Sequence, residues 1–184
     1  KMANTGIDAV HWTNGFWGER FNVFSGTSLQ SMWNTWNTPE VSHGFRNFEI
    51  AAGVCKGEHW GPPFHDGDMY KWMEGVASVY AVNKDPELDK LMDNFIACVV
   101  KAQRADGYIH TPVVIEELNN GIDSHTQADS QQQTVIGTKV GSEDEKGAFA
   151  NRLNFETYNL GHLMMAGIVH HLSLIHISEP TRPY

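Results

Sequence analysis

Two amphipathic segments separated by only a few residues constrain the fold of this chain most strongly. Apolar side chains recur at spacings of three and four over residues 66–82 and again over 86–104, which predicts two helices. Asp85 can cap the second helix and Pro86 suits its first position. Because so short a link joins them, the helices should pack as an antiparallel hairpin. The two stripes are Met69, Trp72, Met73, Val76, Val79 and Tyr80, then Leu88, Leu91, Met92, Phe95, Ile96 and Val99.

Two further segments have helical spacing. Residues 40–53 predict a short helix that Gly53 can terminate. Residues 155–171 predict a longer helix that is apolar over most of its circumference. A helix of that kind belongs inside a larger protein, because one neighbour cannot cover all of its apolar surface.

The remaining segments lack helical spacing. Residues 1–30 are rich in Gly and aromatic side chains, and we expect irregular chain or short strands there. Residues 108–118 contain a β-branched run, which favours a short strand. Residues 119–148 are polar and predict a long loop or hairpin on the surface. The expected architecture is therefore mainly α, with a short irregular or β excursion.

Composition excludes several classes of function. The 184 residues carry 13 Lys and Arg against 22 Asp and Glu, a net charge of −9. We therefore expect no nucleic-acid and no membrane partner, since phosphate groups bind clustered cations. Two cysteines cannot form a disulfide scaffold or a Cys-rich zinc site within this chain. No membrane-length apolar run or signal-peptide pattern is visible, so the sequence leaves the compartment open.

The C-terminus differs from the rest of the chain. Residues 172–182 look like the translation of a sequencing-library adapter, and we interpret 172–184 as a non-native tail. Residues 1–171 are then natural sequence that stops within a domain. The alternative is a natural amphipathic tail that ends at a Pro-rich stop.

Polar residues near the predicted helix starts are the candidates for chemistry. Asp66 and Asp68 can present carboxylates to a sugar or a metal, although capping of helix 66–82 explains them as well. On helix 155–171, Tyr158 and His162 are four residues apart and share a face, with Glu156 nearby. A polar patch on so apolar a helix is costly to bury unless it is satisfied or used, and we weigh function and structure equally there.

Cysteine, histidine and tryptophan give weaker signals. Cys55, Cys98 and the histidines lack metal-ligand spacing, so we assign no nucleophile, no zinc ligand and no cofactor to this chain. Tryptophans can stack on sugar rings or pack in a core, and the core is the better interpretation for Trp72 because it lies on the apolar stripe. The tryptophans considered are Trp12, Trp17, Trp60 and Trp72.

Four segments in this order resemble one family, glycoside hydrolase family 127 and its β-L-arabinofuranosidase-like relatives. A fifth, Gln103-Arg104-Ala105-Asp106-Gly107-Tyr108, is similar to a turn found in several (α/α)6 barrels. The four segments are Asn14-Gly15-Phe16-Trp17-Gly18-Glu19-Arg20, Phe45-Arg46-Asn47-Phe48 with Ala51-Ala52-Gly53, Phe64 to Glu74, and Glu156-Thr157-Tyr158-Asn159-Leu160-Gly161-His162-Leu163.

The resemblance implies an (α/α)6 toroid of antiparallel helical hairpins, of which residues 1–171 are the N-terminal part. It also implies retaining hydrolysis of β-L-arabinofuranosides or related plant-glycan sugars. The family is thought to use a zinc-bound cysteine thiolate as nucleophile and a glutamate as acid/base, which is chemically sound. The carbohydrate substrate and the C-terminal remainder of the same domain are the partners that it implies.

This chain departs from the family pattern where catalysis is decided. The resemblance places the zinc, nucleophile and acid/base residues downstream of the present sequence, so the chain alone should be inactive. The resemblance implies substrate contact for His162, and also for Asp68, Glu156 and Tyr158. A further departure is Phe155, which stands where many relatives have His. The alternatives are a non-catalytic carbohydrate-binding or interaction module with a helical core, and another toroid enzyme such as a sugar epimerase or unsaturated-uronide hydrolase.

Overall fold

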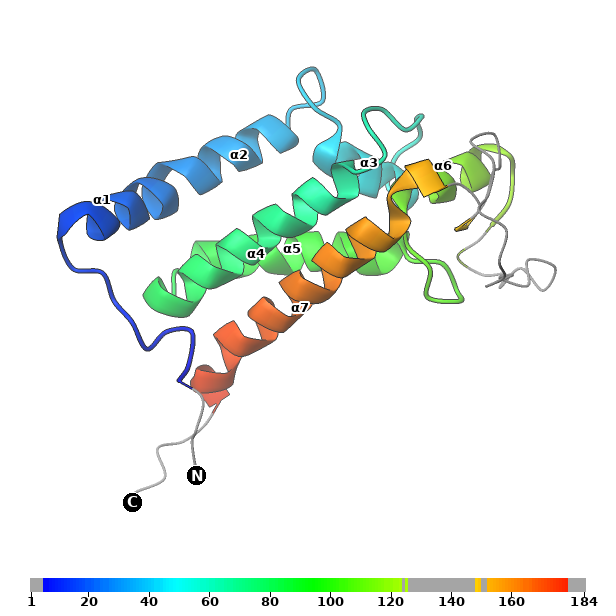
Figure 1. Cartoon of the computed structure of the whole chain (residues 1–184). Coiled ribbons are helices and arrows are strands. Elements are labelled where there is room, and N and C mark those ends of the chain that lie inside the picture. Colours follow the sequence, from blue (N-terminus) through cyan, green and yellow to red (C-terminus); the bar gives the residue numbers. More distant parts are fainter. Residues whose placement is uncertain (1–4, 124, 126–147, 150–151, 179–184) are drawn as a thin grey trace.

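The computed structural model describes residues 5–123, 125, 148–149 and 152–178, and the regular secondary structure of these residues is helical (Figure 1). No strand occurs among these residues, which confirms the mainly α prediction, and none of their helices is long and apolar enough to cross a membrane. Most of the predicted loop or hairpin at 119–148 lies outside the described residues. The elements are α1 (Gly15–Val23), η1 (Phe24–Ser28), α2 (Leu29–Trp36), α3 (Gly44–Ala51), α4 (His65–Asn83), α5 (Pro86–Ala102), α6 (Thr111–Asn119), η2 (Arg152–Asn154) and α7 (Glu156–Ser178).

The hairpin of α4 and α5 is as the sequence predicts. Lys84 adopts a left-handed conformation, with φ of 54°, and ends α4. The Asp85 side chain then accepts a hydrogen bond of 2.9 Å from the Glu87 N–H and caps α5. Every member of the predicted α4 stripe is buried, so this helix runs through the centre of the core.

Helix α7 lies alongside α4 and runs in the same direction (Figure 1). Near the helix starts, the Gly67 N–H donates to Asn159 Oδ1 at 3.0 Å. Near the other ends, Lys84 Nζ donates to the Ser173 carbonyl at 2.8 Å. Helix α5 returns antiparallel to α4, so α4, α5 and α7 alternate in direction. Successive helical hairpins of a toroid have this arrangement.

Helix α7 continues beyond the predicted end at residue 171. It extends to Ser178, and Ser173 is buried against the end of α4. Residues 179–184 lie outside the described residues. The interpretation of 172–184 as a non-native tail remains a prediction.

The expectation of irregular chain or short strands over residues 1–30 was wrong for the helical part of that segment. Helix α1, the π-helical turn η1 and α2 follow one another without a break from residue 15. Packing of α2 against α4 supports this run of helix, whereas most side chains of α1 and η1 are exposed. Trp33 of α2 stacks on Trp72 with ring centroids 4.9 Å apart, and Trp72 Nε1 donates to the Leu29 carbonyl.

The expected strand at 108–118 was also wrong, because residues 111–119 form α6. Pro112 suits the first turn of a helix, and a buried carboxylate from α4 holds the N–H of Thr111. Val113, Val114 and Ile115 are all buried. Tertiary packing therefore overrides the strand preference of the β-branched run.

The shorter predicted helix at 40–53 is present as α3. It ends where expected, since Gly53 follows it with φ of 68°. Asn47 and Phe48 of this helix are fully buried, and Phe48 packs edge-on against Tyr70 of α4. Helix α3 therefore anchors the loops that precede α4 to the core.

Candidate functional site

A lysine that the sequence analysis did not single out links two predicted site residues at the N-terminal ends of α4 and α7. Lys71 Nζ lies 3.1 Å from Asp68 Oδ1 and donates a hydrogen bond to the Tyr158 hydroxyl. The Tyr158 hydroxyl, followed by the Asp68 carboxylate, raises the pKa of Lys71, so its ammonium group is firmly charged. Tyr158 in turn packs edge-on against His162, with ring centroids 4.6 Å apart.

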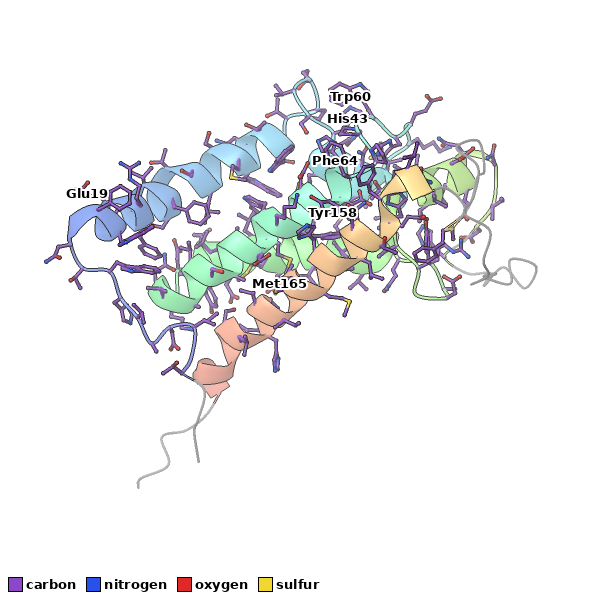
Figure 2. All side chains as sticks on the ribbon, viewed as in Figure 1. Glu19, His43, Trp60, Phe64, Tyr158 and Met165 are labelled. Atoms are coloured by element: carbon purple, nitrogen blue, oxygen red, sulfur yellow. The ribbon has the colours of Figure 1, made fainter. Side chains whose placement is uncertain are left out.

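Aromatic rings continue from this group toward the loop before α4. Phe155 contacts both Tyr158 and Phe64, with centroid separations of 6.0 and 5.6 Å. Figure 2 shows Trp60, His43, Phe64 and Tyr158 following one another at this end of the molecule, with Met165 farther along α7. We call the exposed rings Trp60, Phe64, Phe155 and Tyr158, together with His162, the aromatic end.

One alternative from the sequence was that Asp66 caps α4, and the structure shows that it does not. Helix α4 has no side-chain cap at Phe64, and Asp66 is buried inside its first turn. Its carboxylate accepts hydrogen bonds from the Thr111 N–H at 2.7 Å and the Thr111 hydroxyl at 2.6 Å. A carboxylate at the start of α6 complements the helix dipole, so Asp66 joins α4 to α6. Asp68 does not cap α4 either, because it faces Lys71.

The close contact between α4 and α7 depends on Gly67 and Asn159. A Cβ atom at Gly67 would lie 2.6 Å from Asn159 Oδ1 and 3.0 Å from a Tyr158 ring carbon. The buried Asn159 side chain also donates to the Pro63 carbonyl at 2.9 Å. This pair therefore sets where Tyr158 lies relative to α4.

Glu156 is held apart from the group at Lys71. One of its carboxylate oxygens, Oε1, accepts hydrogen bonds from the Tyr108 hydroxyl and from the Phe149 N–H. Burial, followed by the Glu156 carboxylate, raises the pKa of Tyr108, which keeps the hydroxyl a donor. The turn that carries Tyr108 is fixed by ion pairs of Arg104 with Asp106 and Glu117.

Histidines gather behind the aromatic end. His110 is fully buried, with Nδ1 3.4 Å from Asp66 Oδ2. Burial lowers the pKa of His59 to about 4, opposed by Asp66 and reinforced by the neighbouring imidazoles. The His59 side chain is therefore neutral at physiological pH. The imidazoles beside it are those of His43, His65 and His110.

The described residues do not provide a metal centre or an activated thiol. No three His, Cys, Asp or Glu side chains in this part of the chain are arranged to hold a metal ion. Burial raises the pKa of Cys98 to about 11 and also raises that of Cys55, so both thiols are protonated and weak as nucleophiles. The described residues therefore do not supply a ligand set for the zinc that the resemblance implies for the family.

The family model of the β-L-arabinofuranosidase GH127 catalytic domain matches residues 9–174. The chain belongs to the GH127 β-L-arabinofuranosidase family. This GH127 segment is also 32% identical over 130 residues to a non-reducing end β-L-arabinofuranosidase of Bifidobacterium longum subsp. longum. That alignment covers 71% of the present chain and 16% of the relative, so the segment spans about a sixth of its curated relative.

Solved structures of GH127 proteins share the fold of this segment. A GH127 β-L-arabinofuranosidase from Geobacillus stearothermophilus T6 superposes with a TM-score of 0.67 at 29% identity, over 89% of this chain and 22% of that one. A second GH127 β-arabinofuranosidase gives 0.66 at 23% identity, over 91% and 23%. These matches support the prediction of a partial helical toroid.

The structure brings together some predicted site residues of the GH127 segment and separates others. Asp68, Tyr158 and His162 form one group through Lys71, whereas Glu156 binds Tyr108. Sequence reasoning missed Lys71, although its position three residues after Asp68 on a helix was a usable signal. Of the tryptophans considered, Trp72 is in the core as predicted, whereas Trp12, Trp17 and Trp60 are exposed.

Proposed function

We propose that the protein to which this chain belongs hydrolyses terminal β-L-arabinofuranosides with retention, and that this segment supplies part of the sugar-contacting surface. The match of the family model to residues 9–174 carries the proposal. The Bifidobacterium longum relative, a non-reducing end β-L-arabinofuranosidase, agrees with it.

The residues at the starts of α4 and α7 suit a sugar. Sugar hydroxyls both donate and accept hydrogen bonds, and this surface offers a cation, a carboxylate, a phenol and an imidazole. In the proposal, Tyr158 and His162 contact the terminal sugar. Asp68 and Lys71 hold the Tyr158 ring, since Lys71 Nζ bonds its hydroxyl and lies 4.9 Å from its centroid.

Glu156 has a different position in the proposal. Its Oε1 accepts hydrogen bonds from Tyr108 and Phe149 and its side chain is buried, so in the proposal Glu156 positions the start of α7. The turn at 103–108 thus orients this carboxylate at the first turn of α7.

We assign no catalytic residue to this chain. A nucleophilic cysteine must reach its thiolate form, and the raised pKa values of Cys55 and Cys98 oppose that. In the proposal, the nucleophile, the acid/base and any metal ligands come from other parts of the domain.

The exposed side of α7 is the proposed contact with those other parts. Met164, Met165 and Ile168 lie on neighbouring positions of the helix and are exposed. We call these three residues the aliphatic flank. Soluble proteins seldom leave such a patch uncovered, and the matched relatives are several times longer than this chain.

The test is release of nitrophenol from 4-nitrophenyl β-L-arabinofuranoside. We expect the 184-residue chain alone to release none above the blank. A chimaera in which this segment replaces the matching 130 residues of the Bifidobacterium longum relative should hydrolyse the substrate. His162→Ala in that chimaera should lower kcat/KM by roughly 10-fold, the worth of one lost hydrogen bond.

Val100→Ala on α5 is the control, because Val100 is exposed and lies outside both the aromatic end and the aliphatic flank, and it should leave kcat/KM unchanged. Hydrolysis by the chain alone would overturn the assignment of catalysis to other parts of the domain. A folded, active chimaera that is indifferent to His162→Ala would overturn the proposed sugar contact.

A further inference from the structure

Four histidine rings that are separated in the sequence meet behind the aromatic end. His59 lies in the loop that leads into α4, and its half-buried ring faces the other three imidazoles and the Asp66 carboxylate. Those three imidazoles stand at the starts of α3, α4 and α6 and belong to His43, His65 and His110. We call the four histidines the imidazole cluster.

The imidazole cluster is enclosed but has few hydrogen bonds. His110 is fully buried and His65 is 9% exposed. One ring nitrogen of each histidine is buried and has no hydrogen-bond partner in the part of the chain that the structure describes. These atoms are Nδ1 of His43, Nε2 of His59, Nδ1 of His65 and Nε2 of His110. An unsatisfied buried polar atom costs stability, so four of them in one place indicate a role other than holding the fold together.

The loop segment 57–64 closes this cluster, and we call it the strap. Gly61 of the strap approaches α4 so closely that a Cβ atom on it would lie 2.5 Å from His65 Nδ1. The Trp60 ring packs in a T-shaped contact against His43, with ring centroids 5.0 Å apart (Figure 2). His59 is itself part of the strap. Movement of the strap away from α4 would therefore separate these rings and admit water to their buried nitrogens.

Neutral asparagine side chains fasten the strap to three helices. Asn47 of α3 donates to the Trp60 carbonyl at 3.0 Å and accepts from the Trp60 N–H at 3.2 Å. Asn119 of α6 and Asn159 of α7 each donate to a backbone carbonyl of the strap, at 3.0 and 2.9 Å. Amide side chains stay uncharged throughout the physiological pH range, so these anchors do not respond to pH. The histidines beneath the strap do.

A positive charge in the cluster has little to balance it. Among the groups that face His59 in the described part of the chain, Asp66 supplies the carboxylate, and its oxygens already accept hydrogen bonds from the Thr111 N–H and hydroxyl. Lys56 and Glu58, the charged neighbours of His59 in sequence, are exposed. The remaining groups that face it are imidazoles, those of His43, His65 and His110. Charges of like sign repel strongly at a buried site, because the surrounding dielectric constant is low.

We propose that the strap is an acid-sensitive switch, closed over an uncharged imidazole cluster in neutral solution and released from α4 and α6 when the cluster is protonated. Histidine is the side chain that commonly changes charge between about pH 5 and 8. Burial lowers the pKa of His59 to about 4 in the closed state, so a proton binds more tightly after opening and favours the open state as the pH falls below about 6.5.

Release of the strap would change the aromatic end. Trp60 and Phe64 belong to both, and both rings are exposed on that surface. Acid would therefore withdraw two of its aromatic rings while the helices stay folded. The switch is independent of what the aromatic end binds, so its test does not depend on the proposed hydrolysis.

The experiment is amide hydrogen exchange of the ¹⁵N-labelled 184-residue chain, followed by NMR at pH 7 and pH 5. The probe is the Trp60 N–H, which Asn47 protects only while the strap is closed. The reference is the N–H of Val76, which is fully buried in α4. After correction for intrinsic exchange rates, we expect the protection of Trp60 to fall roughly 10-fold between pH 7 and pH 5. Val76 should remain better protected than Trp60 at both pH values, because the strap opens while α4 stays folded.

His59→Gln keeps a polar side chain that cannot be protonated, so the fall in protection at Trp60 should shrink to roughly 2- to 3-fold. His11→Gln is the matched control, because His11 is exposed and lies before α1, outside the cluster. It should reproduce the roughly 10-fold fall. An unchanged Trp60 protection at pH 5, equal protection of Trp60 and Val76 there, or the same fall in His59→Gln and His11→Gln would each overturn the proposal.

Discussion

The first turns of α7 and its middle present two different surfaces of one helix. At the start, Tyr158 and His162 stand among charged and aromatic groups, with Asn159 fastening the helix to α4. Farther along, Met164, Met165 and Ile168 are exposed aliphatic side chains. The aromatic end is held by hydrogen bonds within this chain, whereas in our proposal the aliphatic flank contacts other parts of the domain.

Asp66→Ala should cause the largest loss of stability, because buried hydrogen bonds hold the elements behind the aromatic end together. Removal of the carboxylate leaves the Thr111 N–H and hydroxyl without their acceptor and separates α6 from α4. We expect the free energy of unfolding to fall by roughly 3 kcal/mol, measured by urea denaturation with circular dichroism. Asp68→Ala, which removes a partly exposed ion pair, should cost less than about 1 kcal/mol. Equal losses would refute this ranking.

Gly67→Ala tests how closely the two helices must approach at the aromatic end. The new methyl group would meet Asn159 Oδ1 at 2.6 Å, so α7 must shift. We expect a loss of about 1–3 kcal/mol in urea denaturation. Gly161→Ala is the control on α7, where a Cβ meets nothing within 4 Å and should stabilise the helix by about 0.5–1 kcal/mol. A neutral Gly67→Ala would show that the contact is loose.

Acid should weaken the aromatic end through His59. Its pKa is about 4 in the folded chain and about 6.5 when unfolded, so below pH 6.5 the unfolded chain binds the proton first. Stability is therefore lost as the pH falls from 6.5 to 4 and is unaffected by this group above 6.5. The loss should be on the order of 1 kcal/mol, because the ring is only partly buried.

Urea midpoints measured at several pH values should show this loss in the native sequence and a smaller one in His59→Gln. The groups that face His59 are Asp66, His110, His65 and His43, and they are unchanged in that variant. An identical pH dependence in the two proteins would show that His59 does not cause the loss of stability in acid.

Polar substitutions on the aliphatic flank should have the smallest effect on stability. Met164 and Ile168 are 60% and 52% exposed, so Met164→Gln with Ile168→Gln should change the free energy of unfolding by less than about 0.5 kcal/mol per site. The same double variant should reduce self-association in size-exclusion chromatography, because it interrupts an exposed apolar patch. A large destabilisation would mean that the flank is already packed within this chain.

The sequence predicted the elements whose side-chain spacing is unambiguous. The stripe of α4 and the Asp85–Pro86 start of α5 are local signals, and the structure confirms both. Helices α2 and α6 were missed because their packing partners are distant in sequence, and α1 was missed because its glycines obscure the helical spacing. Trp33 needs Trp72, and Thr111 needs Asp66, neither of which is a neighbour in sequence.

In the candidate site, too, contacts within one helix could be predicted from the sequence and contacts between distant elements could not. The spacing of Tyr158 and His162 on one helix face indicated their contact, which the structure shows. The hydrogen bonds of Lys71 to Tyr158 and of Asn47 to the Trp60 backbone join elements that are separated in the sequence. No periodicity in the sequence reports such contacts, so only the folded arrangement reveals them.

The π-helical turn at Phe24–Ser28 has a consequence for the aim of the N-terminal helix. Each residue of an α-helix turns the chain by about 100°, so the wider turn shifts the angular phase between α1 and α2. Leu29 and Trp33 can therefore face α4 while Phe16 and Trp17 point to solvent. Deletion of one residue within this turn would rotate α1 by about 100° about its axis and would carry Phe21 away from the core against which it packs.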